Sequence, residues 1–323
     1  MNNGLLNNKK AVAALAGLLI VVFHLWVSVF SGNSVELFIR TTSYIGVDIF
    51  FFLSAYSLGS RKIDSIPAFY LNRLKSVYAK FAFFALIQAL LAHWSVEKLI
   101  GTLVGYELVT KGGGSFLWFL PAIMLLYLMM PFYQRLYEKG PMLTAIGSFL
   151  IWFAVALLLS KLTHYRAGFI LWNRLPIFLL GFLCAKIPKS VIARTKKWIW
   201  TLVLILVGIF LLVEFGFRYR LQVPIWNMFY VLAIPAAVGL TLLVDCIPPS
   251  KYIDAVGSST LEMYGVQMVV GYPIAEVLLR LTGSAVITNL VTVITVITIA
   301  VLLRHMFDLL YGISARMRSS APR

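Results

Sequence analysis

The chain has 323 residues, of which 61% are hydrophobic and only 12% are charged, and its mean hydropathy is +0.90. A soluble domain is about 45–50% apolar and about 25% charged, so this composition excludes an ordinary soluble protein. The formal net charge of +16 does not indicate nucleic acid binding, because the basic residues lie in short loops between apolar runs, where they orient a membrane protein and face anionic lipids.

Ten apolar runs, each close to the 20 or so residues that a membrane-spanning helix needs, follow one another along the chain. They predict an all-α polytopic membrane protein that forms a single domain over residues 1–323. The first run follows Lys9 and Lys10 without a small-residue cleavage site, so we expect a retained span rather than a signal peptide. Cys184 and Cys246 show no zinc-binding spacing, and no metal site is predicted. The runs cover residues 11–30, 43–60, 77–93, 116–133, 141–160, 169–186, 198–217, 225–246, 259–281 and 285–307.

Ten spans place both termini on the same side of the membrane. Cytoplasmic loops of membrane proteins are enriched in Lys and Arg, and cytoplasmic termini put 19 of the 28 basic residues inside. The sequence therefore predicts cytoplasmic termini, with the long loop of residues 94–115 outside. The 19 residues are Lys9, Lys10, Arg61, Lys62, Arg73, Lys75, Lys80, Arg135, Lys139, Lys186, Lys189, Arg194, Lys196, Lys197, Lys251, Arg304, Arg316, Arg318 and Arg323.

Four ionisable side chains lie inside the predicted spans at similar depth. At about 1.5 Å of helical rise per residue, His24 lies about 9 Å and Asp48 about 8 Å from the outer ends of their spans. Arg174 and Glu276 fall at about the same level. An unpaired charge costs about 2.5–3.5 kcal/mol at the membrane centre and somewhat less at this depth. We therefore expect these groups to pair with one another around a water-filled cavity.

The order of several short segments resembles one protein family. The run Gly46-Val-Asp-Ile-Phe-Phe-Phe-Leu-Ser54, preceded by a first-span histidine in Phe23-His24-Leu25, is similar to landmarks of the membrane-bound acyltransferase-3 family of bacterial O-acyltransferases. The resemblance covers most of the chain. It implies ten or so helices and the transfer of an acyl group, usually acetyl from acetyl-CoA, to a sugar hydroxyl of a cell-envelope glycan. Further matching segments are Phe69-Tyr-Leu-Asn-Arg73-Leu-Lys75, Leu117-Trp-Phe-Leu120 with Tyr127 and Pro131, and Arg174-Leu-Pro-Ile-Phe-Leu-Leu-Gly181.

The chain departs from the family pattern at four positions. Ala13 stands where the family usually has an arginine, eleven residues before the histidine, and Ser76 replaces the second arginine of an Arg-x-x-Arg pair that begins at Arg73. Ala55 follows the glycine-to-serine run where a glycine is usual, and Gln267 stands where many members have a histidine. The chain is thus identified as a divergent member of the family. The two missing arginines imply that it binds the donor differently, and an altered or lost activity is the alternative that they raise.

His24 and Asp48 are the predicted catalytic residues. Acyl transfer to a hydroxyl needs a group that removes the hydroxyl proton, and an imidazole that titrates near neutral pH suits this role. Asp48 could orient the imidazole and stabilise its charged form. The alternatives are a structural histidine bonded to the backbone or to Ser28, and an acid that interacts with the dipole at a helix start.

Arg73 and Lys75 are the predicted contacts of the donor. Together with Lys80, Arg61 and Lys62 they form a basic cluster on the predicted cytoplasmic side. Coenzyme A carries phosphates, and the planar guanidinium of arginine matches phosphate oxygens. The alternative is that these charges only set the orientation of the protein in the membrane.

Trp118, Arg174 and Glu276 are the predicted contacts of the polar substrate. Trp118 could stack on a sugar, or it could anchor the helix at the membrane interface. Glu276 has Arg280 four residues later, so an ordinary ion pair along one helix is the alternative for this residue.

Together with these residues, the resemblance implies an O-acyltransferase of the bacterial cytoplasmic (inner) membrane that modifies an envelope polysaccharide or a lipid-linked glycan. The expected partners are acetyl-CoA or another acyl-CoA as co-substrate, the glycan and membrane lipids, and nucleic acid is not expected. The predicted donor contacts Arg73 and Lys75 lie toward the cytoplasmic face, whereas His24 lies toward the outer face. The thin pantetheine arm of coenzyme A would therefore have to pass between the helices to bring its thioester to His24. Two alternatives are a catalytically altered relative that binds or moves a glycan, and an unrelated secondary transporter.

Overall fold

The computed structural model describes residues 5–29, 34–161, 169–194, 196–218 and 229–319. Within these ranges the regular structure is helical and contains no strand, which confirms the predicted all-α class. The first half contains α1 (Lys9–Phe23), α2 (Ser34–Thr42), α3 (Ile45–Gly59), α4 (Ile66–Arg73), η1 (Leu74–Tyr78), α5 (Ala79–Leu91), α6 (Val96–Leu103), α7 (Tyr106–Lys111), η2 (Gly112–Gly114), α8 (Phe119–Lys139) and α9 (Pro141–Lys161). The second half contains α10 (Phe169–Trp172), α11 (Leu175–Cys184), α12 (Lys189–Arg194), α13 (Lys197–Leu211), η4 (Leu212–Arg218), α14 (Phe229–Leu232), α15 (Ile234–Val244), α16 (Lys251–Ser258), α17 (Thr260–Val266), η5 (Gln267–Gly271), α18 (Tyr272–Thr282) and α19 (Ala285–Ser319).

Six helical segments of the described residues are long and apolar enough to cross a membrane. Two further apolar helices, Ile170–Cys184 and Ile234–Val244, are shorter. The multi-pass architecture is thus supported, whereas ten spans stay a prediction. The six segments are Ser34–Gly59, Ile66–Leu91, Phe119–Lys139, Pro141–Leu158, Lys197–Phe215 and Ala285–Leu310.

The first helix ends earlier than its apolar run predicts. The apolar run continues to Phe30, but α1 ends at Phe23, and residues 24–29 are not helical. The reason lies far along the chain: the side-chain amide of Asn289 accepts from the Val27 N–H at 3.2 Å and donates to the Val27 carbonyl at 2.7 Å. Irregular backbone persists in such a protein where other groups satisfy its hydrogen bonds. The depth of about 9 Å for His24 assumed a continuous helix and does not apply.

Helix α3 lies at the centre of the bundle and packs against α1 and α11. Two glycines allow this close approach. A Cβ added to Gly46 would lie 2.4 Å from the backbone oxygen of Ala16, and one added to Gly181 would lie 2.3 Å from that of Phe52. Small residues at helix contacts let backbones approach in membrane proteins. Gly46 therefore holds the end of α1, with His24, beside the first turn of α3.

A buried ion pair joins helices α5 and α17. The Lys80 ammonium of α5 contacts the Glu262 carboxylate of α17, and the side chains are only 4% and 0% exposed. The ring of Phe307 in α19 lies 5.5 Å from the ammonium. The sequence places Lys80 in a basic cluster on the predicted cytoplasmic side. The structure instead buries Lys80 in the core, where it pairs with Glu262.

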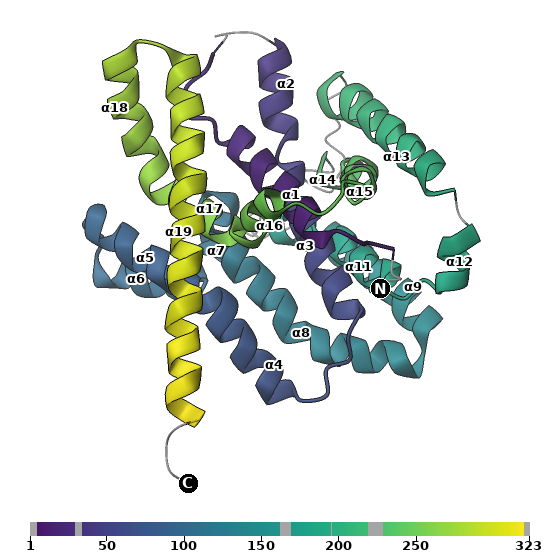
Figure 1. The fold of residues 1–323 in the computed structure, drawn as a ribbon. Helices are drawn as coiled ribbons and strands as arrows, with labels where there is room; N and C mark the ends of the chain where they lie inside the picture. Colours follow the sequence, from purple (N-terminus) through teal and green to yellow (C-terminus); the bar gives the residue numbers. More distant parts are fainter. Residues whose placement is uncertain (1–4, 30–33, 162–168, 195, 219–228, 320–323) are drawn as a thin grey trace.

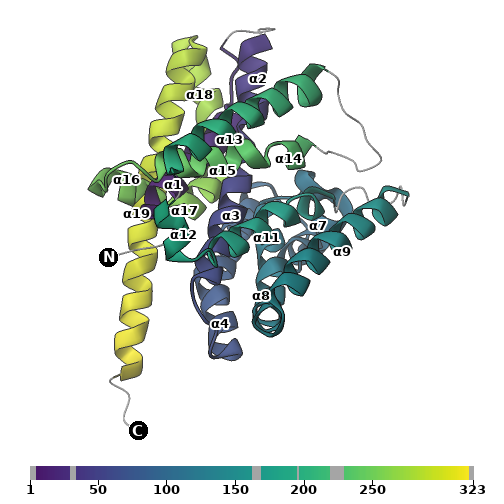
Figure 2. The same cartoon turned by 90° about the vertical axis from the view of Figure 1, so that its right-hand side faces the viewer.

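Four segments lie at opposite ends of the molecule in the order that the predicted topology gives them. Helix α2 and the turn between α18 and α19 lie at one end of the molecule, and both belong to predicted outer loops (Figure 1). Helix α4 and the C-terminal part of α19, which are predicted to be cytoplasmic, lie at the other end in both views (Figure 2). Which end faces the cytoplasm stays a prediction.

Cysteine labelling tests this orientation. Lys62 and Lys98 are exposed and lie on opposite sides in the predicted topology, so each is replaced by cysteine in a chain whose Cys184 and Cys246 are changed to serine. We expect a membrane-impermeant maleimide to label Lys98→Cys in spheroplasts and Lys62→Cys only after permeabilisation. The reverse pattern would invert the topology and place Arg73 outside.

Candidate active site

Three of the predicted site residues line one cavity of about 390 Å³. His24 comes from the end of α1, Trp118 from the residue before α8, and Arg174 from the residue before α11. The sequence therefore identified side chains that the fold brings together from three distant segments. The other lining residues are Ile20, Phe23, Thr41, Tyr44, Val47, Gly113, Ser115, Ile170, Tyr264 and Met268.

His24 is half-buried at the C-terminal end of α1, where its ring is fixed by the backbone. Its Nδ1 lies 2.9 Å from the carbonyl oxygen of Ile20. A carbonyl can only accept, so Nδ1 carries the hydrogen in the neutral ring and Nε2 keeps its lone pair. No hydrogen bond to Nε2 occurs among the described residues. The ring is therefore held in the form that a general base needs.

Asp48 pairs with Arg174 and not with His24. The Arg174 Nε lies 3.2 Å from Asp48 Oδ1, and the two side chains are only 2% and 0% exposed. Asp48 also lies near the middle of the long helical segment Ser34–Gly59, rather than near its outer end. The expected pairing of buried charges is thus present, but no contact between Asp48 and the imidazole occurs among the described residues. The orienting role predicted for Asp48 has no support in this geometry.

Arg174 is enclosed by aromatic rings. Its guanidinium carbon lies 5.0 Å from the ring centre of Trp118 and 5.6 Å from that of Tyr44, and its Nη1 donates to the Ile170 carbonyl at 3.1 Å. These contacts fix the cation at the edge of the cavity. Trp118 and Arg174 thus belong to one packed unit on which a polar ligand can rest.

Glu276 lies outside this cavity. It is exposed on α18 and pairs with Arg280 one turn later, which confirms the alternative that its spacing left open. Glu276 is not one of the cavity's lining residues, so this cavity does not bring it together with His24 and Arg174. Glu276 lies on the exposed face of α18, the helix that follows the π-helical turn η5.

Arg73 lies at the end of α4 between two aromatic rings. Its guanidinium carbon lies 5.2 Å from the ring centre of Phe69 and 4.9 Å from that of Tyr127. Its Nε is buried and has no hydrogen-bond partner among the described residues. The rings hold the cation while leaving a donor available, as an anion site requires. Lys75 is half-buried in the π-helical turn η1 that follows.

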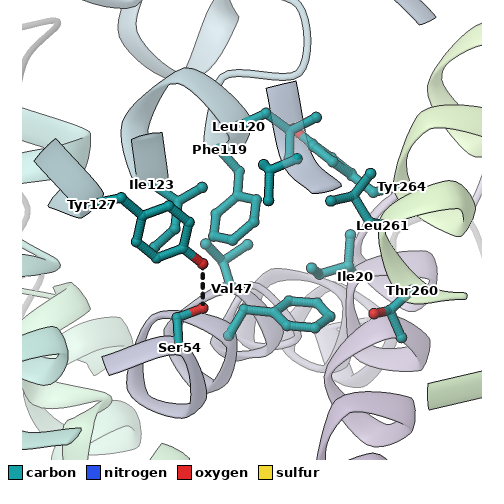
Figure 3. Close-up of a pocket in the computed structure, with 12 residues that line it drawn as sticks. Ile20, Val47, Ser54, Phe119, Leu120, Ile123, Tyr127, Thr260, Leu261 and Tyr264 are labelled. Atoms are coloured by element: carbon teal, nitrogen blue, oxygen red, sulfur yellow. Dashed lines mark hydrogen bonds between the residues drawn. The ribbon is translucent and has the colours of Figure 1, made fainter. Parts of the chain in front are cut away.

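A second, smaller cavity of about 130 Å³ borders the His24 cavity and is lined in part by Tyr127 (Figure 3). It shares Ile20, Val47 and Tyr264 with the His24 cavity. Tyr127, which also contacts Arg73, lies on the opposite side of the cavity from Tyr264, and its hydroxyl donates to Ser54 Oγ at 3.3 Å. A continuous series of cavity-lining residues therefore leads from Arg73 to His24. Its other lining residues are Phe50, Val77, Phe119, Leu120, Ile123, Thr260 and Leu261.

Sequence reasoning missed three contributors to this region. Tyr127 appeared in the sequence only as a family landmark, and Tyr264 carried no signal of its own. Gln267 was visible only as a departure from the family pattern, yet its Nε2 lies 3.5 Å from His24 Nδ1. A search of the described residues for clusters of His, Cys, Asp and Glu that could hold a metal found none.

Comparison with known proteins gives one match. A family model described as an acyltransferase domain matches residues 12–305, which span all the site residues above. Searches of curated proteins and of solved structures found no match. The match covers most of the chain. The chain belongs to the acyltransferase-3 family.

Proposed function

We propose that this protein transfers an acyl group, acetyl being the expected one, from acyl-CoA to a hydroxyl of an envelope polysaccharide or lipid-linked glycan. We place it in the bacterial cytoplasmic membrane. The observation that carries the proposal is the position of His24 in a cavity whose smaller neighbour reaches the side chain of Tyr127 beneath Arg73. In an acyltransferase, a base and an anion site connected in this way fit a thioester donor and a hydroxyl acceptor.

The proposed reaction uses one proton acceptor. The acceptor hydroxyl attacks the thioester carbonyl carbon while His24 Nε2 takes its proton. The C–S bond of the tetrahedral intermediate then breaks, an ester forms, and the imidazolium returns the proton to the leaving thiolate. The products are the acylated sugar and free coenzyme A, so atoms and protons balance without a metal or an oxidant.

The donor is proposed to bind on the Arg73 side. The guanidinium stands between Phe69 and Tyr127 with a buried, unpartnered Nε, which suits a phosphate of coenzyme A. The apolar cavity next to Tyr127 suits the uncharged pantetheine arm. Lys75 is close in sequence and is proposed to support the same phosphates.

The acceptor is proposed to enter the His24 cavity. Its volume of about 390 Å³ falls in the range of roughly 300–1,000 Å³ that is usual for small-molecule sites. Trp118 and Arg174 offer an aromatic ring and a fixed cation to a sugar. Glu276, which lies outside the cavity, has no role in this proposal.

Reconstitution tests the function directly. Purified protein in proteoliposomes receives acetyl-CoA with a labelled acetyl group, together with glycans isolated from cells that lack the gene. We expect label on the glycan by mass spectrometry, and loss of the same ester from the glycans of the deletion strain. Unlabelled glycans in vitro and identical glycans in both strains would overturn the proposal. If the protein only carried glycans, the His24→Ala variant would move them across the vesicle membrane as well as the wild type does.

Arg73 provides a separate prediction on donor binding. Arg73→Ala should weaken coenzyme A binding by about 1.5–3 kcal/mol, the range for a hydrogen bond to a charged group. Arg73→Lys should restore only part, because an ammonium lacks the planar fork. Calorimetry in detergent measures both, with Lys98→Ala as the control cation at an exposed position. If folded Arg73→Ala bound coenzyme A with unchanged affinity, the only role left for Arg73 would be to orient the protein in the membrane.

A further inference from the structure

Gln267 is buried next to the proposed base. It is only 1% exposed, it begins the π-helical turn η5, and its Nε2 lies 3.5 Å from His24 Nδ1. Its Oε1 is buried and has no hydrogen-bond partner among the described residues. Single π-helical turns inside helices often occur at functional sites. This turn places a long amide against the imidazole.

The chemistry of the contact decides how the amide is oriented. Nδ1 lies 2.9 Å from the Ile20 carbonyl and therefore carries a hydrogen. If the amide nitrogen of Gln267 faced Nδ1, two hydrogen-bond donors would point at each other and no hydrogen bond could form. The oxygen and nitrogen of a glutamine exchange places by a half turn of the amide, and hydrogen bonding decides between the two orientations. Turned in this way, Gln267 presents Oε1 to the Nδ1 hydrogen and gives it a second acceptor.

We infer that Gln267 is the positioning residue of the His24 base, and this inference rests on the proposed acyl transfer. The carbonyl oxygens of Ile20 and Gln267 together hold the hydrogen on Nδ1 and keep the Nε2 lone pair available. They also stabilise the imidazolium that forms when Nε2 takes the hydroxyl proton. This is the work of the acid in a catalytic triad. It falls to an amide here because Asp48 is engaged by Arg174.

Other polar groups surround the ring, and the test must separate their effects. Arg174, Tyr44 and Tyr264 line the same cavity, and Asp48 lies behind Arg174. On α2, Glu36 and Arg40 bind the backbone of the segment that follows His24, through Val29 N–H and the Leu25 carbonyl. None of these groups changes when residue 267 is substituted.

Two substitutions of Gln267 have opposite expected effects. Gln267→Leu removes the acceptor and should lower kcat about tenfold, as expected for the loss of one hydrogen bond, with the KM for acetyl-CoA unchanged. Its activity should persist to lower pH, because the imidazolium is less stable. Gln267→Glu places a carboxylate at Nδ1, so its activity should fall at a higher pH than in the wild type. In His24→Ala, Gln267→Leu should have no further effect on the residual rate.

A second measurement does not require activity. Diethyl pyrocarbonate modifies neutral imidazoles, and peptide mass spectrometry reports the rate for His24 alone as a function of pH. The pH profile of modification should shift up in Gln267→Glu and down in Gln267→Leu. If the wild type transfers acetyl but neither profile moves, Gln267 is structural and the inference fails. If the wild type transfers nothing while the modification profiles shift, the proposed function fails and the contact stands.

Discussion

Replacing His24 with alanine should slow acyl transfer by about 10²–10⁴-fold, the usual cost of removing a positioned base. The ring lines the larger cavity, and its Nδ1 is held by the Ile20 carbonyl. Alanine removes the proton acceptor without disturbing the distant Arg73 platform, so coenzyme A binding and membrane insertion should persist. The initial rate of acetyl transfer by purified, folded variants measures the effect.

The same role fixes the pH dependence of the wild-type reaction. The imidazole must be neutral to accept the hydroxyl proton, so the rate should decline at acidic pH as the ring becomes charged. His305→Ala is the matched control, because His305 is exposed on α19 and lines a different cleft. Near wild-type transfer by His24→Ala, or equal losses in both variants, would leave His24 with a structural role.

Breaking the buried pair of Asp48 and Arg174 should have the largest effect on stability. Arg174→Met leaves the Asp48 carboxylate without its partner in the protein interior, and such a change costs about 3–5 kcal/mol. The side chain of Arg174 is only 2% exposed, so water cannot replace the lost contact. Reversible unfolding in mixed detergent micelles measures the free energy of unfolding.

A double variant and a surface pair provide the controls for this experiment. Asp48→Leu combined with Arg174→Met removes both charges and should recover much of the lost stability, since buried pairs replaced by apolar residues are often neutral. The exposed pair of Glu276 and Arg280 is the surface control. Arg280→Met should cost at most about 0.5 kcal/mol. A stable Arg174→Met protein would show that water or a ligand reaches Asp48.

The sequence predicted the helical class and the site residues that carry charge, because both depend on local chemistry. Apolar runs fix where helices form, and a costly ionisable group in such a run marks a functional or paired position. His24 and Arg174 were identified in this way and line one cavity. The partner of each charge could not be predicted, because helical rise gives depth but not rotation or neighbour. Asp48 therefore seemed as close to His24 as to Arg174.

Two other errors have the same origin in distant contacts. The end of α1 at Phe23 depends on Asn289, which lies more than 260 positions later in the chain. The burial of Lys80 depends on Glu262, which only the packing of α5 on α17 reveals. Gln267 has no charge and no periodic signal, so only the contact with His24 Nδ1 identifies it.

The partition between the two cavities has a consequence for the membrane itself. Only Ile20, Val47 and Tyr264 are shared by the space around His24 and the space beside Tyr127. Substrates that enter from opposite faces would otherwise leave a continuous aqueous path for ions. All three side chains are less than 10% exposed, and their hydrophobic surfaces resist wetting. With the donor and the acceptor entering from opposite faces, as the predicted topology and the proposed reaction require, this apolar boundary would let an acyl group cross the bilayer without dissipating the proton gradient.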